Sequence, residues 1–201
     1  MGSPWLSIWV EPRRTIQAIV DRDPKFMVLP LAALAGIGEA LDRASLRHML
    51  DEVSLATMLL VCLLGGIFAG IVGLYLYAFL ARVSGRWLGG NGTSGQLRAA
   101  LAWASVPMVA ALLVWLPEAW LFGRDLFTAA QPRIDANPLA FLGLTLLELA
   151  LGVWSLVLAC KTIGQVHGFS AWRGAATVLI SVLLVVVPLF LLVYGAMSLG
   201  G

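Results

Sequence analysis

Residues 55–81 read LATMLLVCLLGGIFAGIVGLYLYAFLA, and none of these 27 side chains is charged. Two further stretches, 99–117 and 174–201, also lack charge. A helix needs roughly 20 apolar residues to cross the hydrocarbon core of a bilayer. The three stretches therefore predict an integral membrane protein, in which lipid replaces water as the solvent for most of the chain.

The composition supports this class and argues against a separate soluble domain. Apolar residues make up 60% of the chain and charged residues 12%, against about 45–50% and 25% in soluble domains. No polar stretch reaches the roughly 50 residues that a second domain requires, so we expect one membrane domain over 1–201. Cys62 and Cys160 fall within apolar stretches, where we interpret both as packing residues.

The pattern predicts an all-α fold, a polytopic membrane bundle of five transmembrane helices. Asp23-Pro24 and Asn137-Pro138 each combine a helix cap with proline in the first turn. Thr93 and Gln96 fit a capping box before another helix. The predicted spans are 24–45, 55–81, 96–117, 138–161 and 171–198.

Residues 1–23 precede the first span and are predicted to lie on the cytoplasmic membrane surface. Trp5, Ile8 and Trp9 are spaced to share one helical face, and apolar residues repeat in the same way after Pro12. This spacing favours a short amphipathic interfacial helix anchored by tryptophans, with an ordered coil on the bundle as the alternative. The segment lacks the pattern of a cleavable signal peptide, so we expect it to be retained.

The distribution of Lys and Arg predicts the orientation of the bundle. Positive residues concentrate in cytoplasmic loops, and alternate loops here hold nine on one side and four on the other. The N-terminus is therefore expected in the cytoplasm and the C-terminus outside. The nine are Arg13, Arg14, Arg22, Lys25, Arg82, Arg86, Arg98, Lys161 and Arg173, and the four are Arg43, Arg47, Arg124 and Arg133.

Small residues and prolines suggest how the helices pack. Gly66 and Gly70 form a GxxxG motif followed by Gly73, and such a stripe lets two helices approach closely in lipid. The contact lies either within the chain or between subunits. Pro107 and Pro188 stand inside predicted spans and should kink them, which serves either a gate or the shape of the bundle.

Glu148 is the most conspicuous candidate for a functional residue. It is eleventh in the span that begins at Pro138, about 15 Å along the helix, and so lies near the predicted bilayer midplane. An ionisable group at that depth is costly and suggests a functional site. The alternative is a hydrogen-bonded carboxyl that joins helices, in keeping with Thr145 and Ser155 on the same helix.

A second acidic group stands at the outer end of the first span. Glu39 and Arg43 are four residues apart in the order that favours an ion pair, and Asp42 is close enough to join them. The simpler interpretation is a salt bridge near the membrane surface. The functional one is a polar vestibule on a path that leads to Glu148.

The remaining candidates for chemistry are weak. His48 and Glu52 lie one helical turn apart and are possible metal ligands, but a solvated loop explains them better and we predict no metal. Residues 90–95 match GxGxxG, yet the strand that a dinucleotide site requires is absent, so we expect no cofactor. The helix that follows these glycines offers its N-terminus to an anionic lipid headgroup, with Arg86 and Arg98 nearby.

Several short motifs together resemble the prokaryotic branch of the Yip domain family, the Ypt/Rab-interacting proteins. They are Pro4-Trp5 with Ile8 and Pro12-Arg13, the loop 88–93, the stretch 102–107, and Gly164 with 167–170. The resemblance implies five spans and a cytoplasmic N-terminus. Eukaryotic members act in vesicle traffic and bind prenylated Rab GTPases, but the Asp-Leu-Tyr-Gly-Pro type of motif is missing here, which argues against Rab binding.

We therefore expect a non-enzymatic protein of a bacterial inner membrane that organises membrane or binds a partner. Membrane lipids are the expected partners, with a homo-oligomer or a second membrane protein as further candidates, and no nucleic acid. The alternative function is an ion or small-molecule transporter, a channel or a lipid-translocating protein. Its polar path would use Glu39, Asp42 and Glu148.

Overall fold

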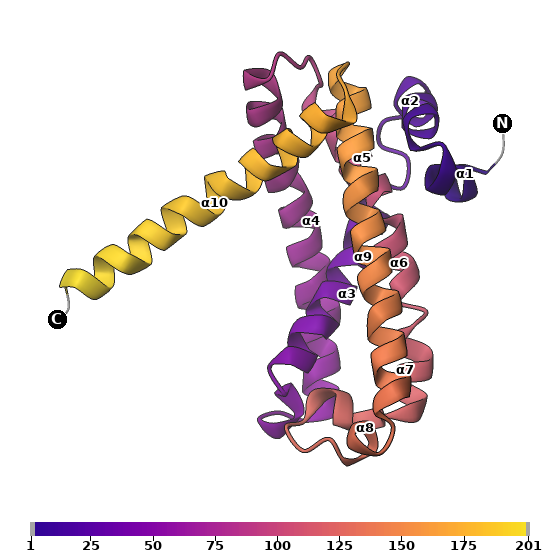
Figure 1. The fold of residues 1–201 in the computed structure, drawn as a ribbon, viewed down its shortest axis with the longest axis vertical. Helices are drawn as coiled ribbons and strands as arrows, with labels where there is room; N and C mark the ends of the chain where they lie inside the picture. Colours follow the sequence, from indigo (N-terminus) through magenta and orange to yellow (C-terminus); the bar gives the residue numbers. More distant parts are fainter. Residues whose placement is uncertain (1–2, 200–201) are drawn as a thin grey trace.

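The computed structural model describes residues 3–199, and every regular element in that range is a helix (Figure 1). The predicted all-α class is thereby confirmed. The elements are α1 (Pro4–Val10), α2 (Pro12–Arg22), α3 (Val28–Leu46), η1 (Met49–Asp51), α4 (Leu55–Trp87), α5 (Ser94–Ala104), α6 (Val106–Ala111), α7 (Trp115–Leu121), η2 (Gly123–Phe127), α8 (Pro132–Ala136), α9 (Pro138–His167) and α10 (Ala171–Leu199).

Four helical segments within the described range are long and apolar enough to cross a membrane. They are Leu55–Trp87, Ser94–Leu121, Pro138–His167 and Ala171–Tyr194. The chain is therefore an integral membrane protein with four candidate spans. The predicted first span corresponds to α3, which has 19 residues, but its three charged side chains make it less apolar than the other four.

The loops gather at two opposite ends of the bundle (Figure 1). One end, which we call the basic end, carries α1, α2, the α4–α5 loop and the α9–α10 turn. The other, the acidic end, carries η1, η2 and α8. The nine Lys and Arg residues counted on one side of the sequence belong to the basic end and its adjoining helix ends, as the alternation of loops requires.

The N-terminal segment forms two helices where one was predicted. Pro12 has no backbone N–H and takes the first position of a new helix, so α1 ends at Val10 and α2 begins at Pro12. Both helices pack against the bundle, with Ile8 and Ile16 completely buried. Because the segment is helical, the alternative of an ordered coil on the bundle is wrong.

The expected helix start at Asp23-Pro24 is wrong. Asp23 instead closes α2 and accepts a hydrogen bond from the Lys25 backbone N–H at 2.9 Å, and α3 begins only at Val28. Met27 adopts a left-handed conformation with φ of 57°, which interrupts any helix. The indole of Trp103 holds this turn by donating to the Phe26 carbonyl at 3.1 Å.

The glycine stripe packs within the chain, between α3 and α4. A Cβ atom on Gly70 would overlap the Ala32 carbonyl oxygen of α3, and one on Gly66 would lie 2.8 Å from the Gly36 carbonyl oxygen. The two backbones therefore touch along Gly36, Gly66 and Gly70. Gly73 lies outside this contact, with no neighbouring atom within 4 Å of its Cβ position.

The third predicted span is broken into α5, α6 and α7. Pro107 stands in the first turn of α6, where its missing N–H interrupts the hydrogen-bond ladder that would continue α5. The hydroxyl of Ser155 on α9 donates to the Ala104 carbonyl beside this break at 2.7 Å, and that of Thr162 donates to the Ala100 carbonyl at 3.1 Å. The helix is thus interrupted at Ser105, two residues before the proline.

The last two helices extend further than expected. α9 continues to His167 and stops at Gly168, whose φ of 77° suits glycine. α10 crosses α9 where Gly174 meets the backbone of Cys160, and it continues without interruption through Pro188. Figure 1 shows that α10 leaves the bundle obliquely, with its C-terminal part away from the other helices.

Candidate functional site

Three carboxyl groups from three helices approach one another in the half of the bundle nearer the acidic end. Asp42 of α3 and Glu118 of α7 lie within electrostatic range of Glu148 of α9. The Glu118 side chain is buried, with 3% of the residue exposed. Oε1 of Glu148 is also shielded and has no hydrogen-bond partner. Among these three, Asp42 and Glu148 were predicted to share one polar path.

Glu118 was not singled out by the sequence. It directly follows the uncharged stretch 99–117 and therefore marks the end of that predicted span. The available signal was its position between Trp115 and Trp120 in an otherwise apolar stretch. Only the packing of α9 against the rest of the bundle brings Glu148 within electrostatic range of Glu118.

Glu39 and Arg43 lie outside this group. They form the predicted ion pair, and both side chains are more than half exposed, so the pair contributes little to stability. Within residues 3–199 the other ion pair joins Glu11 and Arg14. In this range, therefore, Asp42, Glu118 and Glu148 have no ion-pair partner, and burying a carboxylate without such a partner is energetically costly.

The weak metal candidates do not meet in a site. His48 has a left-handed backbone with φ of 49°, and its Nδ1 is buried without a partner, while Glu52 is exposed. Asp51, between them, accepts a hydrogen bond from the Ala129 backbone at 2.8 Å. Among the described residues, no group of three His, Cys, Asp or Glu side chains is placed to hold a metal ion.

At the basic end, the buried side chain of His167 joins the α4–α5 loop to the end of α9. Its Nδ1 accepts the Gly92 backbone N–H at 3.1 Å. Its Nε2 lies 3.2 Å from the Ala81 carbonyl, to which the ring donates in its neutral form. A Cβ on Gly85 or Gly90 would overlap the imidazole, so these glycines make the room that the ring occupies.

The α2 helix is attached to the same region. The Arg13 guanidinium donates to the Phe169 carbonyl at 3.0 Å, and the Gln165 amide donates to Gln17 at 3.2 Å. The Phe169 ring stacks on His167 with centroids 5.1 Å apart. We call α1, α2, the loop 88–93 and the turn 168–170 together the cap.

Trp103 of α5 anchors the other side of the cap. It is fully buried, and its ring lies 5.0 Å from that of Trp5 and 5.9 Å from that of Phe26. Trp5 is 36% exposed and Trp9 is partly buried against the core. Trp5 and Trp9 were predicted to contact lipid headgroups, but much of the surface of each side chain faces protein.

The two arginines predicted to lie near a lipid headgroup differ in their exposure. Arg86 is exposed near the end of α4, whereas Arg98 is half-buried and its guanidinium lies 4.6 Å from the centroid of the Tyr75 ring. The tryptophans most open to the surroundings are Trp87, Trp172 and Trp120. The first two stand at the basic end and the third near the acidic end, as in the aromatic belts of membrane proteins.

Comparison with known proteins assigns the chain to a family. The model of the Yip1 domain matches residues 6–194, which is nearly the whole chain. The chain belongs to the Yip1 domain family. No curated protein and no solved structure shows detectable similarity to it. Members of the Yip1 domain family are generally non-enzymatic membrane proteins.

The Yip1 resemblance of the sequence rests on motifs that meet in space. Trp5 packs on Trp103, and Gly92 hydrogen-bonds to His167, whose ring stacks on Phe169. Pieces from the beginning, middle and end of this Yip1 domain therefore build the cap and its attachment to the bundle.

Proposed function

We propose that this Yip1-domain chain is a non-enzymatic membrane-organising protein that binds a membrane partner through the cap. The observation that carries the proposal is that α1 and α2 are folded onto the ends of α5 and α9 while leaving apolar side chains uncovered. Leu6 and Val10 on α1 are 74% and 78% exposed. A preformed surface with such residues at the end of a membrane bundle is suited to contact a partner at the interface.

The proposal includes a topology. α3 is the fifth span, since 19 helical residues extend about 28 Å, close to the thickness of the hydrocarbon core. The N-terminus and the cap then lie in the cytoplasm, and the C-terminus lies outside. The membrane in this proposal is a bacterial inner membrane, and the chain belongs to the prokaryotic branch of the family. The support for this orientation is the concentration of Lys and Arg at the basic end.

Site-specific crosslinking in native membranes tests the partner. A photoreactive amino acid at Leu6 should give one reproducible adduct of defined mass, either with a second copy or with another membrane protein. The control is the same group at Phe68, a 71% exposed residue within α4, which should label lipid. Recovery of monomer alone from both positions would contradict the proposal.

A second candidate function is transport of an ion, a small molecule or a lipid. The specific support is the meeting of Asp42, Glu118 and Glu148 without a cationic partner in the described part of the chain. Purified protein in proteoliposomes would then conduct a flux that Glu148→Gln abolishes while the fold is retained. Glu52→Gln, at an exposed acid of the outer loop, is the matched control. Absence of flux in the unmodified protein would exclude this function.

A further inference from the structure

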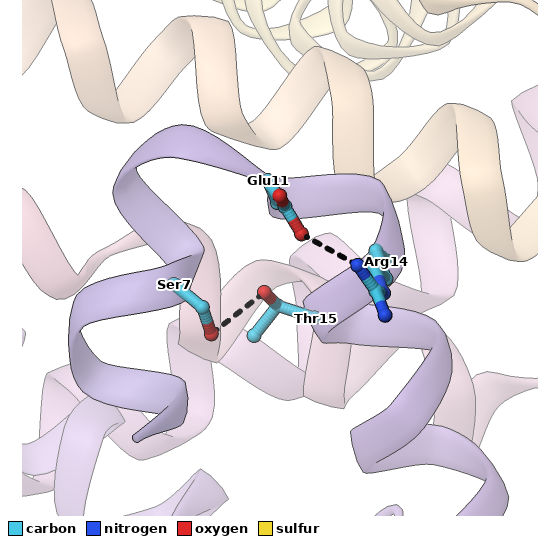
Figure 2. A network of polar contacts seen from close by, with 4 residues as sticks. All are labelled: Ser7, Glu11, Arg14 and Thr15. Atoms are coloured by element: carbon cyan, nitrogen blue, oxygen red, sulfur yellow. Dashed lines mark hydrogen bonds and ion pairs between the residues drawn. The ribbon is translucent and has the colours of Figure 1, made fainter. Parts of the chain in front are cut away.

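A groove of about 880 Å³ lies between α1 and α2 on the outside of the cap. Figure 2 shows Ser7 of α1 facing Thr15 of α2, and Glu11, between the two helices, pointing toward Arg14. The volume falls within the usual range for small-ligand sites. Its principal lining residues are Ser7, Glu11, Arg14, Thr15, Arg22 and Phe26.

The inner part of the groove is polar. The Thr15 hydroxyl donates to the Ser7 hydroxyl oxygen at 2.9 Å, which ties α2 to α1 (Figure 2). Next to it, the Arg14 guanidinium lies 3.4 Å from the Glu11 carboxylate. Both of these charged side chains are more than half exposed, so each remains open to a ligand.

The charges of the groove are of both signs. Arg14 and Arg22 supply two guanidinium groups, and Glu11 and Asp23 supply two carboxylates. Guanidinium groups bind phosphate through several hydrogen bonds, whereas carboxylates accept hydrogen bonds from ammonium groups. A ligand that carries only negative charge would be attracted by the arginines and repelled by the acids.

Apolar side chains also line the groove, which reaches the turn before α3. Val10 and Phe26, 78% and 45% exposed, both line it. Phe26 belongs to the turn from which the chain enters α3. A ligand with a charged head and an apolar tail would therefore place its head beside Arg14 and its tail toward the bundle.

From this arrangement we propose that the groove binds a zwitterionic phospholipid with a primary amine, of the phosphatidylethanolamine type. Arg14 contacts the phosphate, the adjacent Glu11 accepts hydrogen bonds from the ammonium group, and the acyl chains run along the groove past Phe26. The proposal extends the proposed function of the cap, because it names a lipid that helps to seat the cap on the membrane.

Native mass spectrometry of the full chain in detergent tests the proposal, with palmitoyl-oleoyl phosphatidylethanolamine and the corresponding phosphatidylcholine as probes. We expect the ethanolamine lipid to bind about tenfold more tightly, because the trimethylammonium of choline has no N–H to donate to the acids. Glu11→Gln should reduce this preference. Arg14→Gln should weaken binding of both lipids.

Two further variants keep the test decisive. Ala18→Phe fills the groove without removing a charge, since Ala18 lines it, and should abolish the ethanolamine preference. Arg173→Gln removes an exposed arginine elsewhere at the basic end and should leave the preference unchanged. Equal binding of the two lipids by the unmodified protein, or a preference that survives Ala18→Phe, would overturn the proposal.

The two proposals for the cap fail in different ways. Leu6 does not line the groove, so a protein adduct at Leu6 together with no lipid preference refutes only the lipid proposal. Lipid preference with no adduct refutes only the protein partner.

Discussion

At the residue scale, His167 connects parts of the chain that are more than 70 residues apart. It sits where α4, the loop 88–93 and the end of α9 meet, and both ring nitrogens have backbone partners. Three glycines surround the ring. The need for glycine at Gly85 therefore comes from the volume of the imidazole rather than from an unusual backbone angle.

We predict that Gly85→Ala destabilises the protein by about 1–3 kcal/mol, the range for an overpacked site. The new methyl group would overlap the imidazole of His167. In a His167→Ala background the same substitution should cost much less, because the ring is gone. Thermal unfolding in detergent of the two single variants and the double variant measures this coupling. Additive effects of the two substitutions would contradict the steric explanation.

At the element scale, the contact of α3 with α4 depends on glycines whose backbones touch. Helices in lipid lack a hydrophobic force between them, so close packing supplies much of their association. The sequence predicted a packing stripe at Gly66, Gly70 and Gly73. Which helix packs on this stripe, and the absence of Gly73 from the contact, depend on how α4 is rotated about its axis relative to α3. That rotation is a property of the assembled bundle.

Gly70→Ala and Gly73→Ala form a matched pair within α4. Gly70→Ala should lower the unfolding temperature, because the added Cβ would overlap the Ala32 carbonyl oxygen and force α3 away from α4. Gly73→Ala meets no atom within 4 Å and should be neutral or stabilising by up to about 1 kcal/mol, since alanine favours helix. Circular dichroism during heating compares the unfolding temperatures of the two variants. Equal destabilisation would argue against the close contact of α3 with α4 at Gly70.

At the scale of the whole molecule, the two ends of the bundle differ in charge and in construction. The basic end carries the folded cap, while the acidic end carries short helices and lies nearer the three carboxyls. This polarity underlies the proposed orientation, because positively charged loops remain in the cytoplasm.

Cysteine labelling from one side of the membrane measures that orientation. In a background without Cys62 and Cys160, we expect Ala130→Cys to react with an impermeant maleimide on intact cells. Asn91→Cys should react only after the membrane is permeabilised. Both positions are exposed, so burial does not explain a difference. Labelling of Asn91→Cys on intact cells would reverse the topology.

The sequence by itself determined the helical membrane class, the approximate places of the long apolar helices, the capping box at Thr93 and Gln96, and the Glu39–Arg43 pair. These depend on runs of side chains or on spacings within a few turns, where local geometry suffices. The start of α3 was misplaced because the Trp103 indole, far away in the chain, holds the preceding turn.

Only the tertiary structure decided which residues meet. It brought Glu118 within electrostatic range of Glu148, surrounded His167 with glycines, and formed the groove between α1 and α2. Each of these arrangements joins segments whose relative position depends on how helices rotate and cross. No local pattern records that rotation, because it results from the packing of all the helices together.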